Sequence, residues 1–372
     1  MNLHLNAYKA YAIDPFYLSI YRLFYCLVVL LFLGLPAYTW ISGMPDYLFD
    51  PPVLSMANLF DGFPVKALML ALTAINILAF MCMFLGIGTR WTSLLFSITA
   101  IIGHSFWYSF GKIDHMILWY LAPAFLGFAG WGNYFNVSGN KVAVREPDNA
   151  VIIFLFALTI GFSMFTSGVQ KLEGGWLNWR GEGVRYHLIR NFLIIDRTKF
   201  LATFFLDFKP HLIWKLMDYA ALFLEVGFLF SVARLKYFRA FLVMAVFFHV
   251  AILMMFNIAF YANLIAYSLF INWSSLFSNW KERFIEGGFS GSRTLRKLNI
   301  ALALAFTSCW LYLLCFKPAS FFLPGLLESC FAAVAVADPF QNSLLLMFLL
   351  ALIITSYLSY RSLLNRARIR IR

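Results

Sequence analysis

Apolar runs of about 20 residues recur from one end of this chain to the other. A run of that length, folded as an α-helix, crosses the roughly 30 Å hydrocarbon core of a bilayer. Of the 372 residues, 62% are hydrophobic and only 12% are charged, which is too few charges for the surface of a soluble protein of this size. The sequence therefore predicts an all-α, polytopic membrane bundle, because a transmembrane β-barrel would show short alternating strands instead.

The apolar runs divide into ten predicted spans. The stretch 238–276 is too long for one span, and we divide it at Asn257. The first run lacks a small-residue cleavage site, so we interpret it as a membrane segment rather than a signal peptide. The predicted spans are residues 16–40, 65–87, 91–108, 115–130, 150–170, 212–233, 238–256, 258–276, 298–317 and 342–361.

Lysines and arginines are concentrated in every second connection between spans. This pattern predicts the orientation of the chain in the membrane, because basic residues favour the inside. With the N-terminus inside, the inside connections and the tail hold Arg90, Lys141, Arg145, Arg234, Lys236, Arg239, Lys281, Arg283, Arg293, Arg296, Lys297, Arg361, Arg366, Arg368, Arg370 and Arg372. The outside connections are acidic, with Asp46, Asp50, Asp61, Glu328 and Asp338. We therefore expect a multi-pass cell-membrane protein with both termini inside. The net charge of +12 then needs no nucleic-acid partner.

One outside connection, residues 170–211, departs from this charge rule. Its basic residues are Lys171, Arg180, Arg185, Arg190, Arg197, Lys199 and Lys209. A connection of about 40 residues is more often functional or disordered than a simple linker. Its tryptophans and apolar residues argue against disorder, so we expect one or two short helices at the membrane interface, with aromatic side chains at headgroup depth.

Ionisable side chains in predicted spans are costly and usually face the bundle interior, so each is a candidate site residue. These residues are Arg22, His104, Asp114, His115, Lys171, Asp218, Glu225 and His249. Arg22 has a second interpretation, because its side chain could snorkel to a nearby interface. His104 and His249 are also compatible with core histidines that bond neighbouring helices. Glu225 requires a cationic or hydroxyl partner.

Three of these candidates fall at the outer ends of predicted spans. Asp114, His115 and Lys171 can therefore converge on one outward-facing cavity. Desolvation at an apolar rim disfavours the charged form of a lysine, which would allow it to act as a general base. A nearby histidine could hydrogen-bond a developing oxyanion. The alternative is a lysine solvated at the headgroup level.

The five cysteines show no CxxC spacing, so we expect no metal site built on them. Cys315 lies near the outer end of the predicted span 298–317, and Cys330 lies in the outer connection after it. Both could face an oxidising compartment, where a disulfide is permissible. Two unpaired thiols are the alternative.

Several stretches together resemble the HTTM family, the membrane domain shared with vitamin K-dependent γ-glutamyl carboxylase. SGVQKLEGGWLNWRGEGVRYHL (167–188) is similar to the family pattern of a small residue, Lys-Leu, Trp and then Gly. GTRWTSLLFSITAIIGHS (88–105) and SFGKIDHMILWYLAPAFLGFAGWGNYFNVSG (109–139) are similar to two of its spans. LFLEVGFLF (222–230) and FFHVAILMMFNIAFYANLIAYSLFINW (247–273) follow in the family's order. The resemblance covers residues 10–280.

The resemblance implies a membrane enzyme of the lyase type whose site opens to the outer side. Lys171 matches the lysine that deprotonates vitamin K hydroquinone in the carboxylase, and His115 matches the histidine that assists it. A quinone-type cofactor is implied, with Asp114, Trp176 and His249 beside it. We expect Glu225, Arg22 and His104 to contact and position these groups without touching the substrate themselves.

The chain also departs from the carboxylase. Residues 281–372 are predicted to hold two more spans and a basic cytoplasmic tail, and nothing there resembles the carboxylase's large lumenal portion. Bacterial family members of similar length include factors that mature a secreted peptide toxin. A non-catalytic factor for a secreted peptide, docked on the outer basic loop, is therefore the alternative to an enzyme. A transporter ranks third, because the sequence shows no paired repeat halves.

Overall fold

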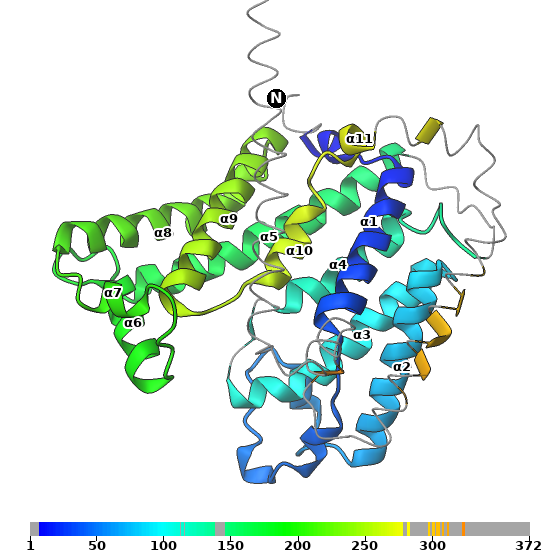
Figure 1. Ribbon diagram of the computed structural model, residues 1–372, viewed down its shortest axis with the longest axis horizontal. Helices are drawn as coiled ribbons and strands as arrows, with labels where there is room; N and C mark the ends of the chain where they lie inside the picture. Colours follow the sequence, from blue (N-terminus) through cyan, green and yellow to red (C-terminus); the bar gives the residue numbers. More distant parts are fainter. Residues whose placement is uncertain are drawn as a thin grey trace, which may run out of the picture. The chain divides into compact units, whose positions relative to one another are not determined.

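The computed structural model describes residues 7–111, 113–114, 116–137, 146–277 and 281–282, together with the short stretches 297, 300–301, 303–305, 307–308, 311 and 322–323 (Figure 1). Apart from one pair of two-residue strands, the regular secondary structure of these residues is helical. They divide into two compact units. One unit contains residues 7–11 and 154–272, and the other contains residues 12–153 and the described residues from 273 onward.

Five described helical segments are long and apolar enough to cross a membrane, which identifies a multi-pass membrane protein. Each corresponds to one of the predicted spans. The segments are Pro15–Leu33, Lys66–Leu85, Thr89–Phe110, Asn149–Glu173 and Leu235–Phe256.

The helices between residues 12 and 145 belong to the second unit. The long ones are α1 (Pro15–Val28), α2 (Lys66–Leu85), α3 (Thr89–Trp107) and α4 (Met116–Ala129). A π-helical turn, Val29–Leu33, continues α1. Short 3-10 helices are Thr39–Gly43, Asp46–Leu48, Met56–Leu59 and Tyr108–Phe110. Strand β1 (Leu35–Pro36) pairs antiparallel with β2 (Phe322–Leu323).

The remaining helices follow α5 (Glu146–Glu173), along which the chain enters the first unit. They are α6 (Gly183–Ile194), α7 (Ala202–Leu206), α8 (His211–Ser231), α9 (Leu235–Phe256), α10 (Tyr261–Ser268) and α11 (Trp273–Leu276). Of these, α11 belongs to the second unit, and the 3-10 helix Ala7–Tyr11 belongs to the first unit.

The predicted span 258–276 does not contain one continuous helix. The eight residues of α10 end in a tightened turn, where the N–H groups of Leu269, Phe270 and Ile271 bond carbonyls three residues back. Helix α8 matches the predicted span 212–233 but carries three charged residues, Lys215, Asp218 and Glu225. The predicted spans 298–317 and 342–361 lie almost entirely outside the described residues. The count of ten spans, and the orientation, stay predictions of the sequence.

Local sequence signals explain where several helices begin and end. The Asp14 carboxylate accepts the N–H of Phe16 at 2.8 Å, and Pro15 occupies the first turn of α1, where a missing N–H costs nothing. Helix α2 ends at Gly86, whose φ of 77° is left-handed and favours glycine. Helix α9 ends at Asn257 in the same left-handed conformation, with φ 54°.

Helices α5 and α8 approach closely through two glycines of α5. A Cβ atom on Gly168 would lie 2.8 Å from Val226 Cγ2 and 3.1 Å from Glu225 Cβ. A Cβ on Gly161 would lie 3.0 Å from Val232 Cγ2. Small residues at such crossings let helix backbones approach, a common arrangement in membrane bundles. The crossing therefore brings the end of α5 beside Glu225 of α8.

In the second unit, Gly103 of α3 accommodates the ring of Tyr38, which is fully buried. A Cβ on Gly103 would lie 2.3 Å from Tyr38 Cε2 and Cζ. The Tyr38 hydroxyl donates to the Ala100 carbonyl at 3.1 Å and contacts His104 Nδ1 at 3.2 Å.

We predict that Gly103→Ala destabilises the protein by about 1–3 kcal/mol, because the tyrosine ring must move and its hydrogen bonds are disturbed. Thermal unfolding of the detergent-solubilised chain measures the effect. The matched control is Gly43→Ala, where a Cβ would meet nothing within 4 Å. Equal melting temperatures for the two variants would contradict the described packing.

Candidate functional site

The site begins with an ion pair between the ends of two helices. Lys171, in the last turn of α5, places its Nζ atom 2.7 Å from Glu225 Oε1 and 2.6 Å from Oε2. The Glu225 side chain is 5% exposed and that of Lys171 is 22% exposed. The cationic partner that the sequence required for Glu225 is thus the lysine that it singled out as a candidate base.

The close crossing of α5 and α8 explains why these two side chains meet. Gly168 contacts the backbone and Cβ region of Glu225–Val226, and Lys171 lies three residues further along the same helix face. Because Glu225 is held against α5, its carboxylate reaches Lys171. The Nζ atom also approaches the Ser167 carbonyl at 3.5 Å.

An aromatic ring completes the surroundings of the lysine. Lys171 Nζ lies 5.4 Å from the ring centroid of Trp176, within the range of a cation–π interaction. Trp176 is 9% exposed and packs against Gly183, Val184 and Leu188 in the apolar cluster at this end of the unit. The lysine therefore has a carboxylate and an indole ring as neighbours and keeps partial access to its surroundings.

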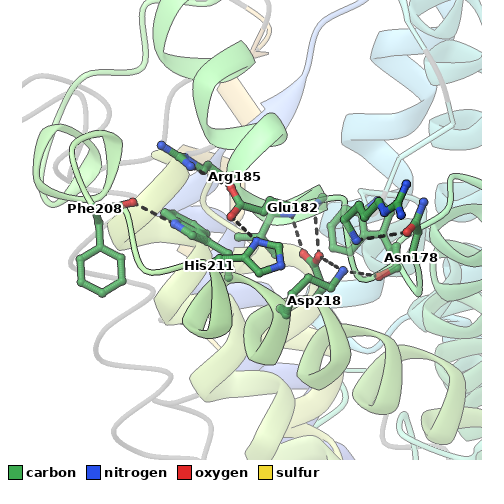
Figure 2. A network of polar contacts seen from close by, with 12 residues as sticks. Asn178, Glu182, Arg185, Phe208, His211 and Asp218 are labelled. Atoms are coloured by element: carbon green, nitrogen blue, oxygen red, sulfur yellow. Dashed lines mark hydrogen bonds and ion pairs between the residues drawn. The ribbon is translucent and has the colours of Figure 1, made fainter.

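A second ion pair on α8 fixes the position of Trp176 and of α6. Lys215 Nζ lies 2.8 Å from Asp218 Oδ2, and both side chains are fully buried. Lys215 also donates to the Trp176 carbonyl at 2.8 Å. The Asp218 carboxylate accepts the N–H groups of Gly183 at 3.1 Å and Val184 at 2.8 Å, which caps the start of α6 (Figure 2).

Lys215 was not among the residues that the sequence analysis singled out. Its spacing of three residues from Asp218 on a helix was the available signal, because residues at that spacing share one face. A fully buried pair that lost one partner would leave an uncompensated charge. Because Lys215 bonds the Trp176 carbonyl and Asp218 bonds the first N–H groups of α6, the pair holds both backbones in place.

Glu182, immediately before α6, links that helix to the start of α8. Its carboxylate lies 2.8 Å from Arg185 Nη1 and 2.7 Å from His211 Nδ1 (Figure 2). Burial of this carboxyl acts to raise its pKa, but the hydrogen bonds and charges of Arg185 and His211 outweigh burial. The net shift lowers the pKa of Glu182 from its ordinary value of 4.5.

The connection between α5 and α8 therefore has a defined structure. It contains two short helices, α6 and α7, which contact one another and the ends of α8 and α9 (Figure 1). Short helices in this connection were expected from the sequence. Their position at the membrane interface stays a prediction.

The other residues of the expected outer cavity lie elsewhere in the chain. Asp114 belongs to the second unit, where its carboxylate accepts the N–H of Met116 at 3.0 Å at the start of α4. His115 lies outside the described residues. Their convergence with Lys171 stays a prediction of the sequence.

His104 is buried between two tyrosines of the second unit. Its Nδ1 atom lies 3.2 Å from the Tyr38 hydroxyl, and its Nε2 atom lies 3.1 Å from the Tyr120 hydroxyl. The ring is also stacked on Trp107, with 5.8 Å between centroids. These contacts agree with the interpretation of His104 as a core histidine that bonds neighbouring segments.

His249 lies in a buried polar cluster of the first unit. Its Nε2 atom lies 3.1 Å from the Tyr267 hydroxyl and 3.3 Å from Asn263 Nδ2. Its ring stacks on Phe260 with 4.6 Å between centroids. The cluster joins α9 to α10, which is the arrangement of a core histidine. The expected contact with a cofactor stays a prediction.

Arg22 is fully buried, so its side chain does not snorkel to an interface. Its Nη2 atom donates to the carbonyls of Phe135 at 2.8 Å and Tyr134 at 3.3 Å. A Cβ on Gly86 would lie 2.7 Å from Nη1, which shows how tightly the guanidinium is packed. Arg22 thus ties α1 to the turn after α4.

The described cysteines, Cys26 and Cys82, are free thiols. Cys315 and Cys330, for which the sequence allows either a disulfide or two unpaired thiols, lie outside the described residues. Within the described part of the chain, no group of three or more His, Cys, Asp or Glu side chains is arranged to hold a metal ion.

The lowered pKa of Glu182 predicts a stability difference at acid pH. A carboxyl whose folded pKa lies below its unfolded value stabilises the fold above the unfolded value of 4.5, and that contribution is lost as the pH falls through the folded value. We therefore expect Glu182→Gln to lower the melting temperature at about pH 6, and we expect this effect to shrink as the pH falls below 4.5 toward about pH 3.5. Tryptophan fluorescence during thermal unfolding measures it. A difference that stays constant between the two pH values would contradict the assignment.

Comparisons with protein-family models, with curated proteins and with solved structures found no match to this chain. What the carboxylase-like stretches imply about activity therefore remains a proposal, supported by the residues of those stretches and by the geometry around Lys171.

Proposed function

We propose that this multi-pass membrane protein is an HTTM-like enzyme of the carboxylase type, in which Lys171 acts as a general base at the outer face. The observation that carries the proposal is the ion pair of Lys171 with Glu225. It holds the lysine of the carboxylase-like stretch in one position beside Trp176. A lysine that was merely solvated at the headgroups would not need a buried carboxylate.

The proposed topology has ten spans with both termini inside, which places the connection 170–211 at the outer face. The distribution of lysine and arginine supports it. In this proposal residues 10–280 form the HTTM-like domain, and residues 281–372 add two spans and the tail. Helices α6 and α7 then lie at the outer interface.

A general base must be neutral before it accepts a proton, and Glu225 can take the proton that Lys171 has to lose. Lys171 Nζ and the Glu225 carboxylate are in hydrogen-bond contact, so a proton can pass directly between them. A proton passed from Lys171 Nζ to the Glu225 carboxylate leaves a neutral amine and a neutral acid. The amine can then accept a proton from a bound hydroxyl, while Glu225 keeps the amine in place.

The amine of Lys171 and the apolar ring beside it are groups of the kind that could contact the hydroxyl and the ring of a quinol. When bound, a quinol supplies an acidic hydroxyl on a flat apolar ring. Lys171 would accept the proton, and Trp176 beside it would form part of the apolar surroundings of the ring. The resemblance adds His115 as the assisting group and Asp114 and His249 as further contacts.

A second candidate function is a non-catalytic factor that matures or exports a secreted peptide. The ordered outer connection favours it, because Arg180, Arg190, Trp179 and Tyr186 are exposed on a fixed scaffold. Exposed aromatic and arginine side chains are common in protein-binding surfaces.

The enzyme proposal is tested with the full chain in lipid nanodiscs, supplied with vitamin K hydroquinone and oxygen. We expect the hydroquinone to be converted to its epoxide, with one oxygen molecule consumed and one water molecule formed for each epoxide. Lys171→Ala should slow this conversion at least about 100-fold, because a positioned base contributes that much or more. Oxygen uptake and chromatography of the product measure the rate.

Lys209→Ala is the matched control, since Lys209 is an exposed lysine of the same connection. It should leave the rate unchanged. A folded Lys171→Ala protein with the wild-type rate, or a wild-type protein that forms no epoxide, would contradict the enzyme proposal. Loss of a co-purifying secreted peptide from an Arg180→Glu, Arg190→Glu double variant would then favour the second candidate.

A further inference from the structure

One face of the outer connection exposes a run of large apolar side chains. They belong to the end of α6, the turn after it and α7. Their exposed fractions are 69% for Leu193, 76% for Ile194, 46% for Ile195, 43% for Phe200, 42% for Leu201 and 61% for Phe204. Such a concentration is uncommon on a water-exposed surface and usually marks a contact with a partner or a membrane.

Basic side chains are interleaved with this apolar run. Arg190 and Lys199 are exposed and Arg197 is half-buried, and together they outnumber the acidic Asp196. We call residues 190–204 the cationic apolar segment. Lysine and arginine beside aromatic and aliphatic side chains are typical of surfaces at the headgroup level of a bilayer.

The cationic apolar segment is fastened to the end of a membrane-spanning helix. Asn257, directly after α9, accepts the N–H of Lys199 through Oδ1 at 2.6 Å and donates through Nδ2 to the Lys199 carbonyl at 2.7 Å. The N–H of Leu201 donates to the carbonyl of Met254 in the last turn of α9 at 3.0 Å. Because α9 is long and apolar enough to span, its end marks the edge of the hydrocarbon region. These bonds therefore hold Lys199 to Leu201 at that edge.

The backbone of the segment has a defined and unusual shape. Asp196 and Phe200 have φ values of 56° and 59°, a conformation that is uncommon for residues other than glycine. The N–H of Arg197 donates to the Asn191 carbonyl at 3.0 Å. Such conformations persist where the surrounding structure enforces them, often at binding sites.

The charge of the segment indicates which partner it fits. The connection before α2 is also exposed and apolar, with Tyr47 84% and Val53 93% exposed, but its charged residues Asp46, Asp50 and Asp61 are all acidic. Phosphate groups would be repelled there. Beside Arg190, Arg197 and Lys199 they would be attracted.

We propose that residues 190–204 bind the headgroups of anionic phospholipids, with Arg190, Arg197 and Lys199 at the phosphates and Phe200 and Phe204 among the upper acyl chains. The inference rests on the proposed outer-interface position of α6 and α7, but not on any reaction at Lys171. The Asn257 bonds to the Lys199 backbone set the depth of the segment.

Hydrogen–deuterium exchange of the full chain in nanodiscs tests the proposal. Nanodiscs contain either phosphatidylcholine alone or equal parts of phosphatidylcholine and phosphatidylglycerol. Exchange of peptides covering 190–206 should be slower with phosphatidylglycerol, by about fivefold for each basic residue engaged. The double variant Arg197→Gln, Lys199→Gln should lose most of this difference, because it keeps the backbone bonds to Asn257 and removes two charges.

The control is Asp50→Asn with Asp61→Asn, which alters charge on the acidic connection and should leave the protection of 190–206 unchanged. Equal exchange in both lipid mixtures would overturn the proposal. Protection that rises with protein concentration in detergent, and not with phosphatidylglycerol, would also overturn it and assign the face to a second copy of the chain. Vitamin K hydroquinone is absent from these measurements, so a failure of the enzyme proposal would leave their outcome intact.

Discussion

The Lys171–Glu225 ion pair is the interaction on which the proposed site depends. It forms because Gly168 lets α5 and α8 approach closely, and it places a charged amine at the end of a spanning helix with a buried counter-charge. A charge at this depth is costly without a partner. The carboxylate therefore determines where the lysine lies.

Helix α8 organises the rest of this end of the unit. The buried pair of Lys215 and Asp218 holds the Trp176 carbonyl and the first N–H groups of α6. Glu182 adds a second link through His211. The connection between α5 and α8 is thus held by polar contacts from α8 near its start, while Asn257, directly after α9, holds the backbone of Lys199. The proposed base and the proposed lipid-binding segment lie in one connection but are held by different helices.

The sequence predicted the class of fold because long apolar runs are visible without tertiary information. It also singled out Lys171 and Glu225 separately, since charged residues in spans are rare. It could not pair them, because the rotation of α5 against α8 depends on which small residues meet at the crossing. For the same reason the burial of Arg22 and the tyrosine partners of His104 were left open. The broken helix within 258–276 was missed because this stretch contains no charged residue, glycine or proline that would signal a break.

A charge exchange between the two helices tests the central claim most directly. Lys171→Glu and Glu225→Lys, made singly, each place two like charges in contact, and breaking a buried pair costs up to about 3–5 kcal/mol, less here because Lys171 is 22% exposed. Made together they restore opposite charges across the crossing. The account predicts that the double variant recovers most of the lost melting temperature in detergent. A double variant no more stable than the weaker single variant would contradict it.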